Sequence, residues 1–257
     1  MATALVTGAT AGIGESFTRL LAQEGYDLVL VARDSARLQE RAKSLEAKYQ
    51  IRTEVLSADL ADANQLALVA ARLSSPIDPI EVLINNAGFG IKDSFLKSKI
   101  EDEIQLIDVL AKAPMQLMHA ALTQMLERNS GVIINVSSVA SFIAGGTYSA
   151  AKSYLTVHTE SLHTELAKTN IKISALCPGF TRTEFHQRGK MKMTGLPNFM
   201  WLDADRVVRD SWRAAQARRV ICIPGWQYKI LATIARFGPR PLVRRLGIKV
   251  RSKQRNK

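Results

Sequence analysis

Cysteine is scarce in this chain of 257 residues, which contains only Cys177 and Cys222. The two lack the spacing of a metal site, and each lies at the end of a predicted strand. We therefore expect no bound metal. We also expect both thiols to be free, reduced and structural, which indicates a cytoplasmic protein.

Long apolar runs are absent as well, and none approaches the ~20 residues of a membrane span. The first predicted strand begins almost at once, without the basic and apolar regions of a signal peptide. The sequence shows no internal repeat, no low-complexity stretch and no interdomain linker. With 47% apolar residues over this length, we expect one α/β domain with a large core.

Acidic residues are missing from residues 226–257, which hold ten Lys or Arg. The net charge of the whole chain is +12, so most of its basicity lies in this segment. Apolar residues from Tyr228 to Ile248 form a stripe along it. We expect an extension of a domain at 1–225, in which a helix packs on the body and a disordered basic tip follows. Docking on an anionic membrane is a less favoured alternative, and we do not expect nucleic-acid binding.

Predicted strands and helices alternate along the chain, which is typical of a doubly wound parallel sheet with helices on both faces. We therefore expect an α/β fold of the Rossmann type with about seven strands. Strands are predicted near 3–7, 27–32, 52–57, 80–85, 131–137, 171–177 and 219–223. Helices are predicted near 12–24, 35–49, 62–74, 100–127, 147–168 and 203–217.

A glycine-rich stretch, Thr7–Gly14, follows the first predicted strand and opens a helix, and Gly25 ends that helix before the second strand. In such a setting glycines let backbone N–H groups approach a pyrophosphate, and the helix N-terminus adds partial positive charge. The alternative is a tight turn that only needs glycine's backbone freedom. We favour a dinucleotide contact through Gly8, Thr10, Ala11, Gly12, Ile13 and Gly14.

The second strand is predicted to end at Ala32, where an acidic residue commonly holds the ribose of NAD. Arg33 follows instead, and Arg37 lies one turn into the next helix. A guanidinium here pairs with a 2′-phosphate, which favours NADP(H) and leaves NAD(H) open. The alternatives are that Arg33 only solvates a helix N-terminus or that Asp34 neutralises it.

Tyr148 and Lys152 are four residues apart and share one face of a predicted helix. A free tyrosine titrates near pH ~10 and exchanges protons poorly at neutral pH. A fixed cation beside it favours the phenolate, so we expect Lys152 to lower the pKa of Tyr148. The spacing arises often by chance, and an aromatic packed beside a solvated lysine is the alternative.

Five motifs occur in one order, and their joint spacing is far more specific than any one of them. They are Thr7–Gly14, Asn85–Gly88, Asn135–Ser138, Tyr148 with Lys152, and Pro178–Thr183. The series resembles the short-chain dehydrogenase/reductase family, in its compact single-domain branch, over about residues 1–225. The resemblance implies an enzyme that transfers a hydride between nicotinamide and a carbonyl or alcohol.

The resemblance also implies roles for the matching residues. Tyr148 would act as general acid in carbonyl reduction, and Lys152 would bond the nicotinamide ribose. Ser138, ahead of Ser137, would hold the substrate oxygen as charge develops on it. Further cofactor contacts are implied at Asp59, Leu60, Asn86, Ala87, Gly88, Pro178, Gly179, Thr181 and Thr183.

Two features depart from the family pattern. Leu110 takes the position in the long central helix where many members carry an Asn that anchors a water of the proton relay. A leucine cannot hold that water. The interval from Ser138 to Tyr148 is ten residues, a few shorter than is common, with Gly145 and Gly146 in a tight connection.

Apolar residues gather where substrate is expected, beyond the carboxyl ends of the strands. The glycine-punctuated segment 185–202 is predicted to be a mobile lid, with Arg188, Lys190 and Lys192 at one edge. These features favour a ketone or aldehyde with an apolar body and an acidic group, unless the apolar residues are simply core. Those on the strand side are Phe89, Phe142, Ile143, Phe180 and Phe185.

We therefore predict an NADP-preferring carbonyl reductase or alcohol dehydrogenase. The alternative, motivated by Leu110, is a regulatory or scaffold protein that binds the cofactor without efficient catalysis. The resemblance further implies a homodimer or homotetramer formed through the helices near 100–127 and 147–168.

Overall fold

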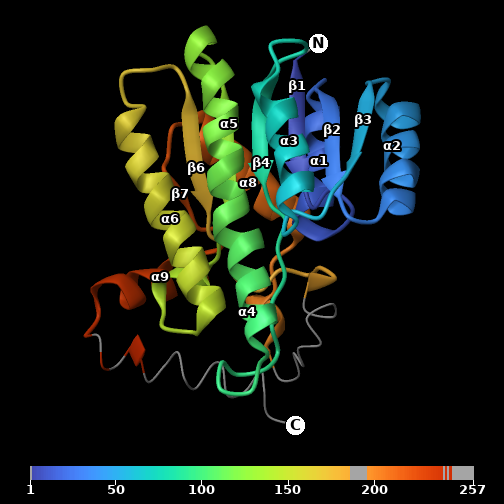
Figure 1. Ribbon diagram of the computed structural model, residues 1–257. Coiled ribbons are helices and arrows are strands. Elements are labelled where there is room, and N and C mark those ends of the chain that lie inside the picture. Colours follow the sequence, from blue (N-terminus) through green and yellow to red (C-terminus); the bar gives the residue numbers. More distant parts are fainter. Residues whose placement is uncertain (1, 186–195, 240, 242, 245–257) are drawn as a thin grey trace.

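The computed structural model describes residues 2–185, 196–239, 241 and 243–244. Its centre is one seven-stranded sheet in the order β3-β2-β1-β4-β5-β6-β7, and every neighbouring pair is parallel (Figure 1). The predicted doubly wound sheet is confirmed. The strands are β1 (Thr3–Thr7), β2 (Asp27–Ala32), β3 (Thr53–Ser57), β4 (Ile80–Asn85), β5 (Val132–Val136), β6 (Lys172–Leu176) and β7 (Ile221–Cys222).

The strand order reverses at β1, because β2 and β3 extend the sheet on one side and β4 to β7 on the other. In open parallel sheets, ligands bind beyond the carboxyl ends of the strands at such a reversal. The glycine-rich stretch follows β1, and Asn86 follows β4. Both therefore lie beyond the carboxyl ends of the central strands, where this fold places a ligand.

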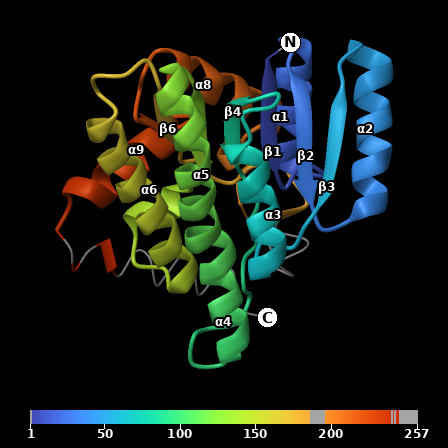
Figure 2. The ribbon, with the colours of Figure 1, turned by 45° about the horizontal axis from the view of Figure 1, so that its top comes forward.

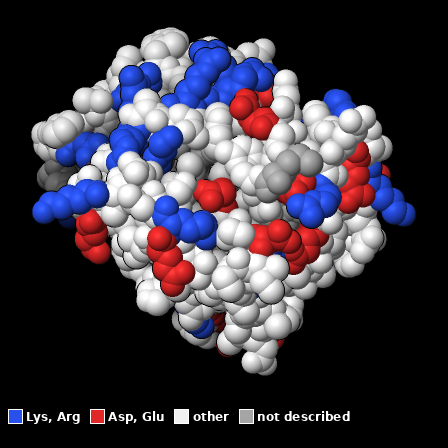
Figure 3. Space-filling view, turned by 90° about the horizontal axis from the view of Figure 1, so that it is seen from above, with Lys and Arg blue, Asp and Glu red and all other residues white. Residues whose placement is uncertain are grey.

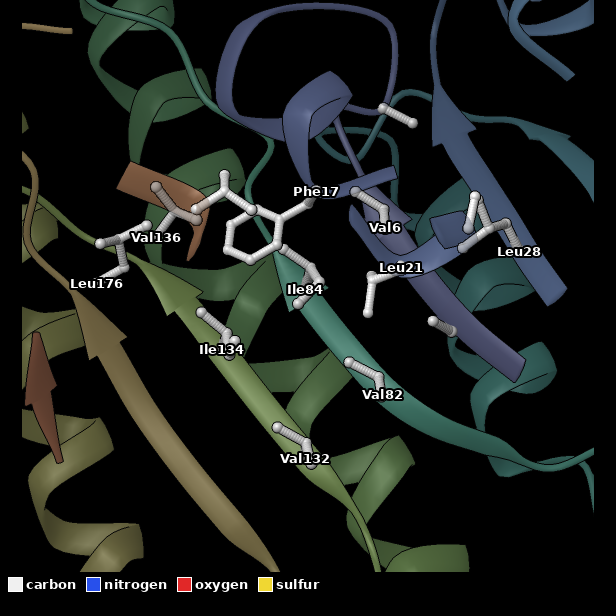
Figure 4. Close-up of a cluster of buried hydrophobic side chains, with 14 of the residues drawn as sticks. Val6, Phe17, Leu21, Leu28, Val82, Ile84, Val132, Ile134, Val136 and Leu176 are labelled. Carbon is white, nitrogen blue, oxygen red and sulfur yellow. The ribbon is translucent and has the colours of Figure 1, made fainter. Parts of the chain in front are cut away.

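Successive residues of the central strands supply two separate cores, because side chains along a strand alternate between faces. On one face Val6, Ile84 and Ile134 pack beneath Phe17 and Leu21 of α1 (Figure 4). The helices over this face are α1 (Gly12–Gln23), α2 (Ser35–Tyr49) and α8 (Ala204–Gln216).

The opposite face of the sheet carries the other set of strand residues. There Leu5, Leu83 and Ile133 pack with Leu117 and Leu155. The helices over this face are α3 (Ala63–Ser74), α5 (Ala113–Arg128) and α6 (Thr147–Glu165), as Figure 2 shows. Burial on both faces explains why the strands read as nearly continuous apolar runs.

The helix predicted near 100–127 is not uniform. It consists of α4 (Ile100–Ile107), a π-helical turn η1 (Asp108–Lys112) and α5. Pro114 lies in the first turn of α5, has no N–H to give to the carbonyl of Leu110 and crowds that carbonyl with its ring. The wider π turn accommodates this conflict and places Leu110 in the interior.

The C-terminal segment begins with α9 (Trp226–Phe237), where the sequence predicts a helix. Tyr228, Ala232 and Ala235 are buried against the body. The predicted disordered tip lies mainly at 245–257, outside the described residues, as do residues 186–195 of the predicted lid. Within the described part of the chain, no helix combines the length and apolar character needed to cross a membrane.

Candidate active site

The glycine turn after β1 is built for close backbone approach. Gly8 and Gly12 have φ values of +68° and +56°, a conformation that other residues rarely adopt. A side-chain carbon at Gly14 would lie 2.2 Å from the Gly8 carbonyl oxygen. Ala11 is the N-cap residue of α1, and its side chain accepts no hydrogen bond from the first N–H groups of the helix. These residues fit a pyrophosphate.

Asn86 ties the glycine turn to the end of β4. Its Nδ2 donates to the carbonyl oxygens of Thr7 at 2.9 Å and Gly8 at 3.2 Å. The Thr7 hydroxyl accepts from the backbone N–H groups of Asn86 and Ala87 at 2.9 and 3.0 Å. The side chain of Asn86 thus positions the cradle, and Gly88 lies exposed at its rim.

Three side chains of the predicted catalytic set come together at the ends of β5 and α6. Tyr148 lies in the first turn of α6, and its hydroxyl is hydrogen-bonded to that of Ser138. Lys152, one turn further on, is 4% exposed, and its Nζ lies 5.9 Å from the centre of the Tyr148 ring. The short connection after Ser138 therefore still brings it to Tyr148.

Ser137 has a structural role rather than facing Tyr148. It is 3% exposed, and its Oγ donates to the Lys152 carbonyl at 2.9 Å and lies 2.7 Å from the Thr156 hydroxyl. These bonds fasten β5 to α6 from within the core. Of the two serines, Ser138 is the one whose hydroxyl faces Tyr148.

Burial dominates the titration of both groups. It raises the pKa of the Tyr148 phenol to about 12, although the hydrogen bond from Ser138 opposes the rise. It also lowers the pKa of the Lys152 ammonium to about 8. The direction is opposite to the expected lowering of the Tyr148 pKa: desolvation is its largest cause, and Lys152 Nζ donates to the Val136 carbonyl at 2.6 Å. At neutral pH this geometry holds Tyr148 as a phenol, the form that can donate a proton.

Comparison with known proteins identifies this arrangement. Residues 2–193 match the family model described as short chain dehydrogenase. The chain belongs to the short-chain dehydrogenase family. A short-chain dehydrogenase from Sphingobium yanoikuyae in complex with NADPH superposes with a TM-score of 0.84 at 30% identity, covering 97% of this chain and 96% of that one.

Curated relatives agree with the structural match. An uncharacterized oxidoreductase from Staphylococcus saprophyticus is 32% identical over 183 residues, which are 70% of this chain and 78% of that protein. The NADP-dependent 3-hydroxy acid dehydrogenase of Schizosaccharomyces pombe is 35% identical over 188 residues, 71% of this chain and 73% of that protein. The chain is thus an NAD(P)-dependent short-chain dehydrogenase.

The adenosine end of this short-chain dehydrogenase has two arginines in different situations. The Arg33 side chain is 69% exposed, and its nearest carboxylate oxygen is on Asp59 at 3.9 Å. The Arg37 guanidinium donates to Glu184 at 3.1 Å. Asp34 caps α2 by accepting from the backbone N–H of Arg37 at 3.0 Å, so its carboxylate serves the helix.

Several other residues with predicted cofactor contacts are buried or make hydrogen bonds within the protein. Thr10, Leu60 and Thr181 are buried, and Asp59 accepts from the backbone N–H of Ala61 at 3.0 Å. The Pro178 carbonyl accepts from Val139 N–H at 3.1 Å. By contrast, Thr183 reaches the glycine turn itself, since a Cβ on Gly12 would lie 2.9 Å from that of Thr183. Ile13 is partly buried against the core.

Leu110 occupies the space beside Lys152. It is fully buried in the cluster that also contains Ala151, and Phe89 and Tyr148 pack against that cluster. A Cβ on Gly88 would lie 2.7 Å from Leu110 Cδ2 and 3.9 Å from Lys152 Nζ. An apolar side chain therefore stands between Gly88 and the neighbourhood of Lys152.

The aromatic residues expected around the substrate divide into two groups. The Phe185 ring lies 6.1 Å from the Tyr148 ring, tilted by 56° to it. Phe180 instead packs against Trp201 and Tyr228, inside the structure. Phe142 lies beneath the Arg236 guanidinium. Arg188, Lys190 and Lys192 lie outside the described residues.

Two residues of the site had no role assigned from the sequence. Tyr228 is 1% exposed; its hydroxyl donates to the Met200 carbonyl at 2.6 Å and accepts from Phe180 N–H at 3.0 Å. A Cβ on Gly179 would lie 2.0 Å from the Tyr228 ring. Glu184 is the second, through its ion pair with Arg37. In the sequence, Gly179 was the one signal that a bulky side chain, here Tyr228, packs against this backbone.

Proposed function

We propose that this short-chain dehydrogenase is an NADP(H)-preferring reductase of carbonyl compounds with an apolar body. The observation that carries the proposal is the hydrogen-bonded pair of Ser138 and Tyr148 beside the buried Lys152, beyond the carboxyl end of β5. The test is replacement of Tyr148 by Phe, assayed for turnover and for NADPH binding.

Each member of the set has a defined task in reduction. The Ser138 hydroxyl binds the substrate oxygen and stabilises the negative charge that develops on it. Tyr148, held as a phenol at neutral pH, donates its proton to that oxygen. Lys152 has three N–H donors, of which one binds Val136 and the others are available to the nicotinamide ribose. NADPH, when bound, supplies the hydride.

The preference for NADP(H) rests on Arg33. Because Arg37 is engaged with Glu184, the more exposed Arg33 is the guanidinium ready to pair with a 2′-phosphate. We expect Arg33→Ala to raise the Kd for NADPH about tenfold or more, as loss of a hydrogen bond to a charged group does. The Kd for NADH, which lacks that phosphate, should stay unchanged in the same fluorescence titration.

Arg206→Ala is the matched control, since Arg206 is an exposed arginine at the start of α8 and should leave both constants unchanged. An unaltered ratio of the two constants in Arg33→Ala would remove Arg33 from cofactor selection. NADH binding tighter than NADPH in the unmodified protein would refute the preference itself.

The substrate is proposed to be a ketone or aldehyde on an apolar body. Phe185 against Tyr148, with Phe89 nearby, supports an apolar surround for the reacting carbonyl. Relatives named NADP-dependent 3-hydroxy acid dehydrogenase and ketoacyl reductase make an acidic group on that body reasonable. The buried, unpaired thiols of Cys177 and Cys222 support a cytoplasmic protein.

A second candidate function is cofactor binding without efficient catalysis. Leu110 favours it, because no amide stands beside Lys152 to hold a relay water. A carbonyl panel followed at the nicotinamide absorbance separates the two candidates. NADPH binding without oxidation by any carbonyl would support the regulatory candidate.

We also propose self-association through α4 and α6. Helices α4 and α6 pack together, and Ile104 of α4 and Val157 of α6 are 56% and 63% exposed, as apolar side chains at a contact surface between protomers would be. We expect Val157→Lys to lower the molar mass measured by light scattering after size-exclusion chromatography. Leu68→Lys, on the equally exposed position of α3, should leave the mass unchanged. A monomeric unmodified protein would contradict the proposal.

A further inference from the structure

Helix α9 has two apolar faces, and only one of them packs on the protein. Tyr228, Ala232 and Ala235 are 1–7% exposed and face the body. The other face is formed by Trp226, Ile230, Ile234 and Phe237, which are 68%, 51%, 50% and 82% exposed. Their spacing places all four on one side of the helix. We call these four residues the α9 face.

The segment that carries the α9 face holds charge of one sign, and Arg236 in it is paired with Glu160 of α6 at 3.4 Å. Lys229 and Arg236 lie on the same helix, and the sequence from 226 to 257 holds ten basic residues and no acidic one. At the end of the molecule where the strands begin, Lys and Arg side chains are interspersed with Asp and Glu (Figure 3). An exposed apolar stripe in a strongly basic segment is typical of helices that lie in the surface of an anionic membrane.

From this charge pattern we infer that the α9 face docks on an anionic lipid surface. The apolar side chains would enter the headgroup and acyl boundary while Lys229 pairs with lipid phosphates. Trp226, at the start of the helix, is the residue type favoured at a membrane–water interface.

Other occupants fit the same face less well. A symmetric contact between two copies would bring two segments with ten cations each against one another, which costs electrostatic repulsion. Nucleic acid would bind the cations through its phosphates but would leave the apolar α9 face in water. The lipid surface satisfies both the apolar stripe and the charge.

Helix α9 contacts segments next to the active site, so docking through it would affect the surroundings of that site. Arg236 stacks over Phe142 at 5.5 Å, in the turn that follows Ser138. Gln227 donates to the Phe199 carbonyl at 2.9 Å, and Phe199 is itself 61% exposed. Resting on the proposed function, docking through α9 would bring the lipid surface close to the turn that follows Ser138.

Cosedimentation of the full chain with vesicles tests the docking. We expect binding to vesicles of phosphatidylcholine with phosphatidylglycerol, and little binding to phosphatidylcholine alone. Ile230→Ser/Ile234→Ser/Phe237→Ser should lower the partition coefficient about tenfold or more, because each change removes apolar area from the lipid contact. Leu68→Ser/Ile77→Ser, at exposed apolar positions away from α9, should bind as the unmodified protein does.

Three results would overturn the inference: no binding of the unmodified protein to the anionic vesicles, equal binding by the triple variant, or tighter binding to duplex DNA than to vesicles. NADPH titration of each variant reports whether it is folded. Because vesicle binding requires no turnover, a failure of docking and a failure of the proposed reductase activity are separate results.

Discussion

Replacing Tyr148 by Phe is expected to lower kcat by a factor of about 10²–10⁴ while the Kd for NADPH changes little. The substitution removes one hydroxyl and keeps the ring, so packing against Phe185 is retained. The developing alkoxide then loses its proton donor, and Ser138 loses its hydrogen-bond partner. Steady-state reduction of an accepted carbonyl, combined with fluorescence titration of NADPH, measures the two quantities separately.

Tyr154→Phe is the control on the same helix. Tyr154 is 40% exposed and its hydroxyl contacts only the sulfur of Met115 among the bonds of its side chain that the structure describes, so turnover should be preserved. Unchanged turnover in Tyr148→Phe would remove Tyr148 from the chemistry. A loss of NADPH affinity equal to the loss of turnover would instead assign it a binding role.

The central strands could be predicted from sequence because burial on both faces makes the middle of each an apolar run. The glycine turn could be predicted because its neighbours forbid side chains: Gly14 has the Gly8 carbonyl within 2.2 Å of where a Cβ would stand. The constraint between Gly14 and Gly8 acts between residues close in sequence. It is the part of the site that a pattern can show.

Other features depend on contacts between distant segments. Arg37 meets Glu184 across 147 positions, and Tyr228 bonds Phe180 across 48. The direction of the Tyr148 pKa was predicted wrongly because spacing reveals a neighbouring cation but not desolvation, which here is the larger effect. The π turn at Leu110 was not predicted, although Pro114 was the signal for it: a proline disrupts the helical hydrogen bond to the carbonyl four residues before it, which is that of Leu110.

Lys152 gives the second large effect, and it predicts a pH profile. Burial lowers its pKa from the ordinary 10.5 to about 8, so its positive charge is lost as the pH rises through about 8. Tyr148, with its pKa raised to about 12, remains protonated across the same range. An alkaline fall in kcat/KM for reduction with a midpoint near 8 is therefore the expected signature of Lys152 rather than of Tyr148.

Lys152→Met isolates that signature. We expect kcat/KM for reduction to fall by about two orders of magnitude or more, because the ribose contact and the local positive charge are both removed. The remaining activity should show no inflection near pH 8, since the group that titrates there is gone. Lys168→Met, at an exposed lysine beyond the end of α6, should keep both the rate and the inflection. An inflection that survives in Lys152→Met would assign the titration to another group and would show that the charge of Lys152 does not set the pH range of the reaction.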